Sequence, residues 1–209
     1  MPDFGSSMSI YDEKGNRKYV TSAERERFLA ASELETPEKR VLCRLLHDTG
    51  CRLTEALELT ASRINVDERS IVFRTLKQGD KDKDGIKKKP KYREIPVSKD
   101  LIDQLDLKFD VRLNQRKLRE KDKALWKISR TTAWRMFKRV MKRAGISGIQ
   151  ATTKGLRHGL AIKLLTSETP APPNIVKDIM GHSHISTTEI YMQAVGAEKR
   201  KIVMRALEN

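Results

Sequence analysis

The sequence has little of what secreted, disulfide-built or membrane proteins need. Its two cysteines, Cys43 and Cys51, are spaced neither as a CxxC zinc knuckle nor as a disulfide framework. We expect both thiols to be reduced and packed in or near a core. The chain has no apolar run approaching the ~20 residues of a membrane-spanning helix, and it does not begin with an apolar secretion segment. These absences predict a cytoplasmic protein that is neither secreted nor inserted into a membrane.

Acidic side chains are in short supply relative to basic ones. The 28 Asp and Glu residues face 43 Lys and Arg residues, which leaves a net charge of +15 on 209 residues. Because Lys and Arg neutralise backbone phosphates, this excess favours a nucleic acid as the partner. An anionic membrane surface is the weaker alternative, because no segment combines a basic face with an aromatic and leucine face. Charge alone does not separate a DNA enzyme from an architectural or ribosomal protein.

The apolar pattern predicts one globular domain that is mainly α-helical. Hydrophobic residues make up 38% of the chain, and two strands, at 70–75 and 92–97, are expected to form a small antiparallel β-sheet, which makes the fold class α+β. Residues 1–20 show no sustained period, so we expect a poorly ordered tail there. Helices are expected from residue 22, from residue 37 to about 50, at 54–59, from residue 101, and at 129–143, 155–166, 173–180, 186–194 and 197–207.

Three segments combine side chains that suit a phosphate. They are residues 49–59 (TGCRLTEALEL), 153–158 (TKGLRH) and 180–191 (MGHSHISTTEIY). Each also has a plain structural explanation. Arg52 and Glu55 could form an exposed ion pair three residues apart. Arg157 and His158 could be a surface pair, and Tyr191 could be a core tyrosine.

The order and spacing of these groups favour a shared site. The series is Arg52, Lys77 between the strands, Lys154-x-x-Arg157, Gly181-His182, and Tyr191 nine residues after that histidine. In this order the three segments resemble the first arginine box, the second arginine box and the nucleophile box of the tyrosine recombinase or phage integrase family. The resemblance extends over about residues 21–191, and it implies that family's catalytic-domain fold, of the DNA breaking-rejoining type.

The resemblance assigns the central catalytic roles to two arginines, a histidine and a tyrosine. Attack on a phosphodiester builds negative charge in the transition state, which fixed cations stabilise. Arg52 and Arg157 would bind the phosphate oxygens with planar forks that a lysine does not replace. His182 would add a hydrogen bond. Tyr191 would attack the phosphorus, forming a 3′-phosphotyrosyl enzyme and releasing a 5′-hydroxyl.

Four further residues receive roles by the same resemblance. Lys77 resembles the hairpin lysine that protonates the leaving 5′-oxygen, although its neighbouring lysines leave that assignment open by position. Lys154 stands where many family members have a histidine, and its role as proton acceptor or phosphate contact stays open. Glu55 resembles the acid that orients the arginine box. His158, next to Arg157, is expected to contact the catalytic residues rather than the substrate.

Backbone phosphates are expected to contact two basic regions. Residues 77–93 carry eight Lys or Arg against three Asp, and a hairpin would place them beside the active site. The second region is the basic side of the helix at 129–143, whose Trp134 and Phe137 we expect in the core. The expected DNA contacts are Lys81, Lys83, Lys87, Lys88, Lys89, Lys91, Arg93, Arg135, Lys138, Arg139 and Lys142.

We expect neither a metal ion nor another cofactor. Asp80, Asp82 and Asp84 are spaced like the start of an EF-hand loop, but Lys91 stands at the twelfth position, where calcium needs a bidentate glutamate. The phosphotyrosyl bond implied by the resemblance conserves the energy of the broken phosphodiester, so no nucleotide is required.

The resemblance implies site-specific recombination of double-stranded DNA through a Holliday junction. It further implies a homotetramer on two synapsed DNA sites, is compatible with a monomer in the free state, and allows accessory DNA-bending or directionality proteins. Two alternatives stay open: relaxation of supercoiled DNA in the manner of a type IB topoisomerase, and a non-catalytic DNA-binding regulator that retains the fold.

The ends of the chain set two further expectations. Most members of the family have a core-binding domain of about one hundred residues ahead of the catalytic domain. We therefore expect this sequence to be either a catalytic domain separated from a longer protein or a short recombinase of the fimbrial phase-variation kind. Residues 192–209 are expected to form a helical tail that docks either on its own domain or on a neighbouring protomer.

Overall fold

The computed structural model of the chain describes residues 9–75, 89–182, 184–192, 203–204 and 207. The predicted helix at 197–207 and the tail at 192–209 therefore lie mostly outside the described residues. The helices are α1 (Ser22–Ser32), α2 (Pro37–Thr49), α3 (Leu53–Leu57), the 3₁₀ helix η1 (Ala61–Arg63), α4 (Lys99–Phe109), α5 (Val111–Gln115), α6 (Arg130–Arg143), α7 (Thr153–Thr166), α8 (Pro173–Met180) and α9 (Ser186–Met192). The strands are β1 (Ile64–Asn65), β2 (Ser70–Thr75) and β3 (Lys91–Pro96).

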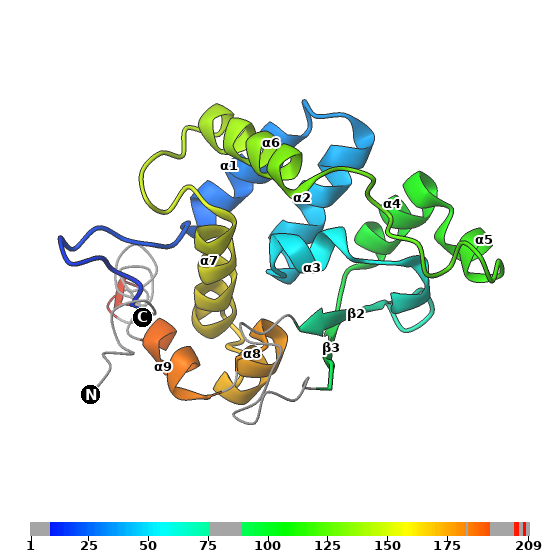
Figure 1. Cartoon of the computed structure of the whole chain (residues 1–209). Coiled ribbons are helices and arrows are strands. Elements are labelled where there is room, and N and C mark those ends of the chain that lie inside the picture. Colours follow the sequence, from blue (N-terminus) through cyan, green and yellow to red (C-terminus); the bar gives the residue numbers. More distant parts are fainter. Residues whose placement is uncertain (1–8, 76–88, 183, 193–202, 205–206, 208–209) are drawn as a thin grey trace, which may run out of the picture.

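Helix α7 passes through the middle of the molecule (Figure 1). It packs against α1 and α2 towards one end and against α8 and α9 towards the other. Helices α1 and α6 meet through the rings of Phe28 and Phe137, whose centroids lie 5.0 Å apart. The prediction of a mainly helical fold with a small antiparallel sheet is confirmed.

The sheet has the order β1-β2-β3, and both pairings are antiparallel. Burial alternates along β3, so that Arg93 and Ile95 face the interior, as expected for a strand with one face on a core. In the register, Ile71 lies opposite Ile95 and Phe73 lies opposite Arg93. The two strands predicted from the sequence are confirmed, and the two-residue strand β1 was too short to be recognised.

The expectation of a poorly ordered tail at 1–20 is wrong for its described part, residues 9–20. Ile10, Tyr19 and Val20 are buried in the core. The backbone amide of Val20 donates to the carbonyl of Gly155 in α7 at 3.0 Å. This contact joins segments that are far apart in the sequence, so a local pattern of apolar residues does not predict it.

Buried polar contacts fix α1 against its neighbours. The helix begins with a capping box, in which the Thr21 amide donates to Glu24 Oε2 at 2.9 Å and Thr21 Oγ1 accepts from the Glu24 amide. Arg25 is 1% exposed, and its guanidinium donates to the carbonyls of Leu156 at 2.8 Å and His47 at 2.6 Å. Arg25 therefore joins α1, α2 and α7.

Several local expectations are settled by burial. Cys43 and Cys51 are free and buried, which confirms the reduced core thiols. Most of residues 110–123 are exposed or partly exposed, but Val111 is fully buried at the start of α5. Within the residues that the structure describes, no helix is long and apolar enough to cross a membrane.

Gly159 provides a stability test of the contact between the N-terminal segment and α7. An added Cβ would lie 2.0 Å from the carbonyl oxygen of Val20. An alanine in an unobstructed helix would add stability relative to glycine, whereas here we expect Gly159→Ala to lower the free energy of unfolding by about 1–3 kcal/mol. Urea unfolding measures this change.

The matched control is Lys163→Ala, on the same helix with a half-exposed side chain, which should change stability by less than about 0.5 kcal/mol. A Gly159→Ala protein as stable as the parent would contradict the packing of residues 9–20 against α7.

Candidate active site

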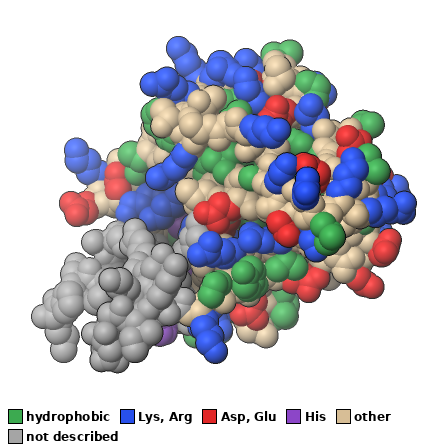
Figure 2. Space-filling view, turned by 45° about the vertical axis from the view of Figure 1, so that its right-hand side comes forward, with side chains coloured by type: hydrophobic (Ala, Val, Ile, Leu, Met, Phe, Trp, Pro, Cys, Tyr) green, Lys and Arg blue, Asp and Glu red, His purple; other side chains and the backbone are tan. Residues whose placement is uncertain are grey.

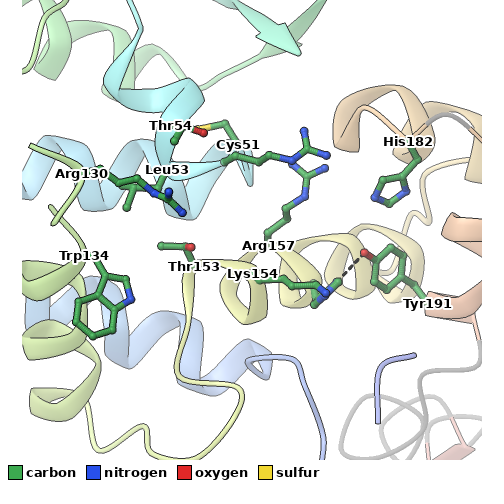
Figure 3. A pocket seen from close by; sticks show the side chains of 12 residues that line it. Cys51, Leu53, Thr54, Arg130, Trp134, Thr153, Lys154, Arg157, His182 and Tyr191 are labelled. Carbon is green, nitrogen blue, oxygen red and sulfur yellow. Dashed lines mark hydrogen bonds between the residues drawn. The ribbon is translucent and has the colours of Figure 1, made fainter. Parts of the chain in front are cut away.

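One cavity of about 460 Å³ contains all five of the described residues that are expected to be catalytic (Figure 3). Its lining comes from the start of α3, from α6 and α7, from the turn after α8, and from α9. The lining residues are Cys51, Arg52, Leu53, Thr54, Arg130, Trp134, Thr153, Lys154, Arg157, His158, His182 and Tyr191.

Helix α7 supplies three of these side chains from a single face. Lys154, Arg157 and His158 stand at positions i, i+3 and i+4, which are neighbours on a helix surface. The close approach of α2 to α7 requires a glycine at position 50. Gly50 has a φ of 59°, and a Cβ there would lie 3.0 Å from Leu160. The chain thus turns tightly over α7 and brings Arg52 to the cavity.

Backbone carbonyls hold Arg157 in place. Its Nη1 donates to the carbonyl of Gly50 at 2.6 Å, and its Nη2 donates to the carbonyl of Met180 at the end of α8. The side chain is almost fully buried, and burial, with the charges of Arg52 and Arg93, lowers its pKa to about 10. Arg157 is still a cation at neutral pH, placed where a bound anion would compensate its charge.

Arg52 and Glu55 form a hydrogen-bonded ion pair at the start of α3. Arg52 Nη1 donates to Glu55 Oε1 at 2.7 Å, and the Arg52 backbone amide donates to Glu55 Oε2 at 2.9 Å. The Glu55 side chain is fully buried, whereas that of Arg52 is 39% exposed towards the cavity. Burial alone would raise the pKa of the Glu55 carboxyl, but Arg93 and Arg52 lower it to about 2.

The expectation that Arg93 contacts DNA is wrong. Arg93 was expected on the DNA-contacting surface, but it faces the interior and pairs with Glu55 through Nη2 to Oε2 at 2.6 Å and Nη1 to Oε1 at 3.2 Å. Its Nε donates to the carbonyl of Ile179 at 3.0 Å. A guanidinium occupied by these partners does not lie on the surface where a DNA backbone would pass.

Tyr191 is buried at the inner end of the cavity. Its Oη lies 2.6 Å from Nδ1 of His158, the hydrogen bond that Figure 3 marks with a dashed line. Burial raises the pKa of the phenol to about 12. The neutral phenol is therefore the hydrogen-bond donor when the proton of the neutral His158 ring sits on Nε2.

Two histidines flank the phenol, and both are neutral at pH 7. Burial, with the charges of Lys154 and Arg157, lowers the pKa of His158 to about 3. Burial, with Arg157 and Arg52, likewise lowers the pKa of His182 to about 3. The His182 ring stacks on Tyr191 with centroids 5.8 Å apart. Because a bound phosphate would offset the cations, it would raise both histidine pKa values.

Some of the other expected site residues lie in the part of the chain that the structure describes, and the rest lie outside it. Lys154 lines the cavity, where burial and Lys18 lower its pKa. Lys91 is exposed at the start of β3, and Lys89, two residues before the strand, is exposed as well. The predictions for five further lysines lie outside the described residues, namely those for Lys77, Lys81, Lys83, Lys87 and Lys88.

The basic side of α6 is only partly exposed to a partner. Arg135 and Lys142 are exposed, but Lys138 Nζ donates to the carbonyl of Ala151 at 3.0 Å. Arg139 binds the carboxylate of Glu35 through two nitrogens, at 3.0 and 2.6 Å. Arg139 is therefore engaged with its own protein, which weakens its expected role as a DNA contact.

The sequence prediction missed two cavity residues on α6. Trp134 was expected in the core, but it is 51% exposed and lines the cavity with Arg130. The buried face of the helix passes instead through Ala133, Met136 and Phe137. These residues satisfy the same helical period one position away, so periodicity alone did not place the tryptophan.

Within the parts of the chain that the structure describes, no three His, Cys, Asp or Glu side chains are grouped closely enough to hold a metal ion.

Known proteins resemble this chain in sequence over most of its length. Tyrosine recombinase XerA of Thermococcus kodakarensis is 29% identical over 196 residues, which make up 90% of this chain and 62% of that protein. Tyrosine recombinase XerD of Corynebacterium glutamicum is 29% identical over 180 residues, 82% of this chain and 54% of that protein. The chain thus spans less than two thirds of either relative.

Solved structures share the fold. The crystal structure of XerA recombinase matches with a TM-score of 0.69 at 23% identity, covering 90% of this chain and 64% of that chain. The catalytic domain of bacteriophage HP1 integrase matches with a TM-score of 0.59 at 22% identity, covering 91% and 96%. Residues 18–197 match the phage integrase family, and with that match over most of its length the chain belongs to this family.

Proposed function

We propose that this chain provides the catalytic domain of a site-specific DNA recombinase, with Tyr191 as the nucleophile. One observation carries the proposal: the Tyr191 phenol shares a cavity with Arg52, Arg157 and two neutral histidines. That set matches the needs of phosphodiester attack, which are a nucleophile, a proton acceptor and cations for the developing charge.

The cleavage step exchanges one phosphate ester for another. A bond forms between Tyr191 Oη and the phosphorus while the bond from phosphorus to the 5′-oxygen breaks. The products are a 3′-phosphotyrosyl enzyme and a DNA end with a 5′-hydroxyl, whose proton Lys77 supplies in this proposal. Rejoining reverses the step with a 5′-hydroxyl of the partner strand, so the reaction needs no external energy source.

The phenol proton must leave as the new bond forms. With a pKa of about 12, forming the phenolate at pH 7 costs about 7 kcal/mol. His158 Nδ1 lies 2.6 Å from Oη and is positioned to accept the proton. Phosphate binding would strengthen it as a base, because the anion offsets the charges of Lys154 and Arg157 that depress its pKa. Lys154 would then contact the phosphate.

Double-stranded DNA is the proposed substrate. Among the fold neighbours, XerH is bound to its difH substrate in a pre-cleavage complex, with a TM-score of 0.66 at 18% identity over 93% of this chain and 59% of that chain. Lys and Arg side chains are spread over the face in Figure 2, with a group along its upper edge. We further propose strand exchange through a Holliday junction within a homotetramer on two synapsed sites.

Replacing the nucleophile tests the proposal. Tyr191→Phe removes only the phenolic oxygen, so we expect no covalent adduct with a nicked suicide substrate and DNA affinity within about twofold of the parent. Denaturing gel electrophoresis measures the adduct, and a mobility-shift assay measures binding. Tyr92→Phe is the matched control, because Tyr92 is exposed on β3, and it should retain full capture.

Undiminished capture by Tyr191→Phe would rule out Tyr191 as the nucleophile. An adduct that forms on any sequence, together with relaxation of a plasmid without a recombination site, would instead indicate topoisomerase activity. DNA binding with no adduct from the parent protein would indicate a non-catalytic DNA-binding protein.

Arg157→Lys tests the guanidinium requirement. The lysine keeps the charge but loses the fork, so we expect the cleavage rate at saturating DNA to fall by about 10²- to 10³-fold. Single-turnover kinetics of adduct formation measures the rate. Arg27→Lys is the control, because Arg27 also donates to a backbone carbonyl, that of Ala144, but lies outside the cavity lining. An unchanged rate in Arg157→Lys would contradict its binding of the phosphate.

A further inference from the structure

The side chain of Arg93 bonds to three other elements around the cavity, which a cation on the protein surface would not do. From β3 it reaches Glu55 on α3, the carbonyl of Ile179 on α8, and Thr75 Oγ1 at 3.0 Å at the end of β2. Its side chain is 7% exposed. A single guanidinium thus ties together two strands and two helices, and its fork geometry is what makes these simultaneous donations possible.

The contact between Arg93 and Glu55 affects the position of Arg52. The Glu55 carboxylate is shared: Arg93 donates to both oxygens and Arg52 Nη1 donates to Oε1. With Arg93 as its buried partner, Glu55 keeps its negative charge inside the protein and holds Arg52 by one side-chain nitrogen. Without Arg93, the buried carboxylate would depend more heavily on Arg52 to offset its charge. The carboxylate would then be protonated more easily, and Arg52 would lose the charged partner that holds it at the cavity.

The contact between Arg93 and the carbonyl of Ile179 affects the position of the turn that contains His182. Arg93 Nε and Arg157 Nη2 donate to adjacent carbonyls, those of Ile179 and Met180, at the C-terminal end of α8. Cations are favourable at this end of a helix, where carbonyls lack helical partners. The next residue, Gly181, has a φ of 62°, and a Cβ there would lie 3.1 Å from Arg93 Cδ. Arg93 therefore packs directly against the residue that precedes His182.

The third contact lies at the end of β2. Thr75 is the last residue of that strand, and Lys77 follows two positions later in the chain. The Arg93 side chain also lies over the Phe73 ring, 5.6 Å from its centroid. Arg93 is consequently fixed to β2 as well as to the helices.

We propose that Arg93 is a positioning residue that holds Arg52, the His182 turn and the end of β2 in one preorganised arrangement through Glu55, Ile179 and Thr75. The catalytic consequence of this inference rests on the proposed function. The structural consequence does not, because the state of Glu55 can be measured without DNA.

The charged groups around Glu55 determine how it should respond to loss of Arg93. Arg52 and Arg93 bond to it directly, and Arg157 and His182 are influenced by the same cluster of charges. Burial pushes the Glu55 pKa upward and the two bonded arginines hold it down. Removing Arg93 should therefore raise the pKa of the Glu55 carboxyl.

The first measurement is the Glu55 carboxyl pKa, from ¹³C NMR of the DNA-free protein. We expect a clear upward shift in Arg93→Met and a smaller one in Arg93→Lys, which retains the charge and disturbs the fold less. Arg44→Met removes another partly buried, ion-paired arginine, on α2, and should leave the Glu55 pKa unchanged. An unchanged Glu55 pKa in both Arg93 variants would overturn the inference, whatever the protein does to DNA.

The second measurement is the pH profile of adduct formation at saturating DNA, between about pH 4 and pH 8. Because Glu55 must be charged to hold Arg52, its raised pKa in Arg93→Met should produce a loss of rate as the pH falls, beginning at higher pH than in the parent. We also expect a rate about 10- to 100-fold lower than the parent's at pH 7.

The double variant Arg93→Met/Glu55→Gln separates positioning from general destabilisation. A glutamine amide does not titrate in this pH range, so the acidic loss of rate seen in Arg93→Met should disappear. A loss that persists in the double variant, or a parent-like rate in Arg93→Met, would overturn the positioning role. Failure of the parent protein to form any adduct would count against the proposed function, and the NMR result would still decide the structural role of Arg93.

Discussion

Arg52, Arg93 and Arg157 converge around one buried carboxylate, that of Glu55, and the cavity depends on this balance of charge. Like charges held close together repel, and burial penalises each of them. Glu55 and the carbonyls of Gly50, Ile179 and Met180 offset part of that penalty. Burial, together with the remaining positive charge, lowers both histidine pKa values, and that charge favours a bound anion.

This balance explains why the resting site is held in an unreactive protonation state. The Tyr191 phenol is neutral and bonded to a neutral His158, and both pKa values lie far from 7. A phosphate entering beside Arg52 and Arg157 would raise the pKa of His158, which is the direction that proton transfer from Tyr191 requires. Substrate binding and activation of the nucleophile are thus the same electrostatic event in this account.

The sequence predicted most of the described helices, the two longer strands and the set of residues that share the cavity, because those depend on local period, turn residues and fixed spacing. It did not predict features set by packing. Ile10, Tyr19 and Val20 are buried, and Gly159 lets the backbone at Val20 approach α7 closely. Ala133 and Trp134 both fit the helical period of α6, and Ala133 is the one that is buried. Arg93 was misplaced by its basic neighbours, although its two-residue spacing from the buried Ile95 could have placed it on the interior face.

The central claim is that Tyr191 forms the covalent bond to DNA. The most direct measurement is mass spectrometry of the proteolysed adduct formed on a nicked suicide substrate, which locates the nucleotide on a single peptide and residue. The account predicts a 3′-phosphate linkage on Tyr191. A linkage on any other residue, or one through a 5′-phosphate, would contradict it.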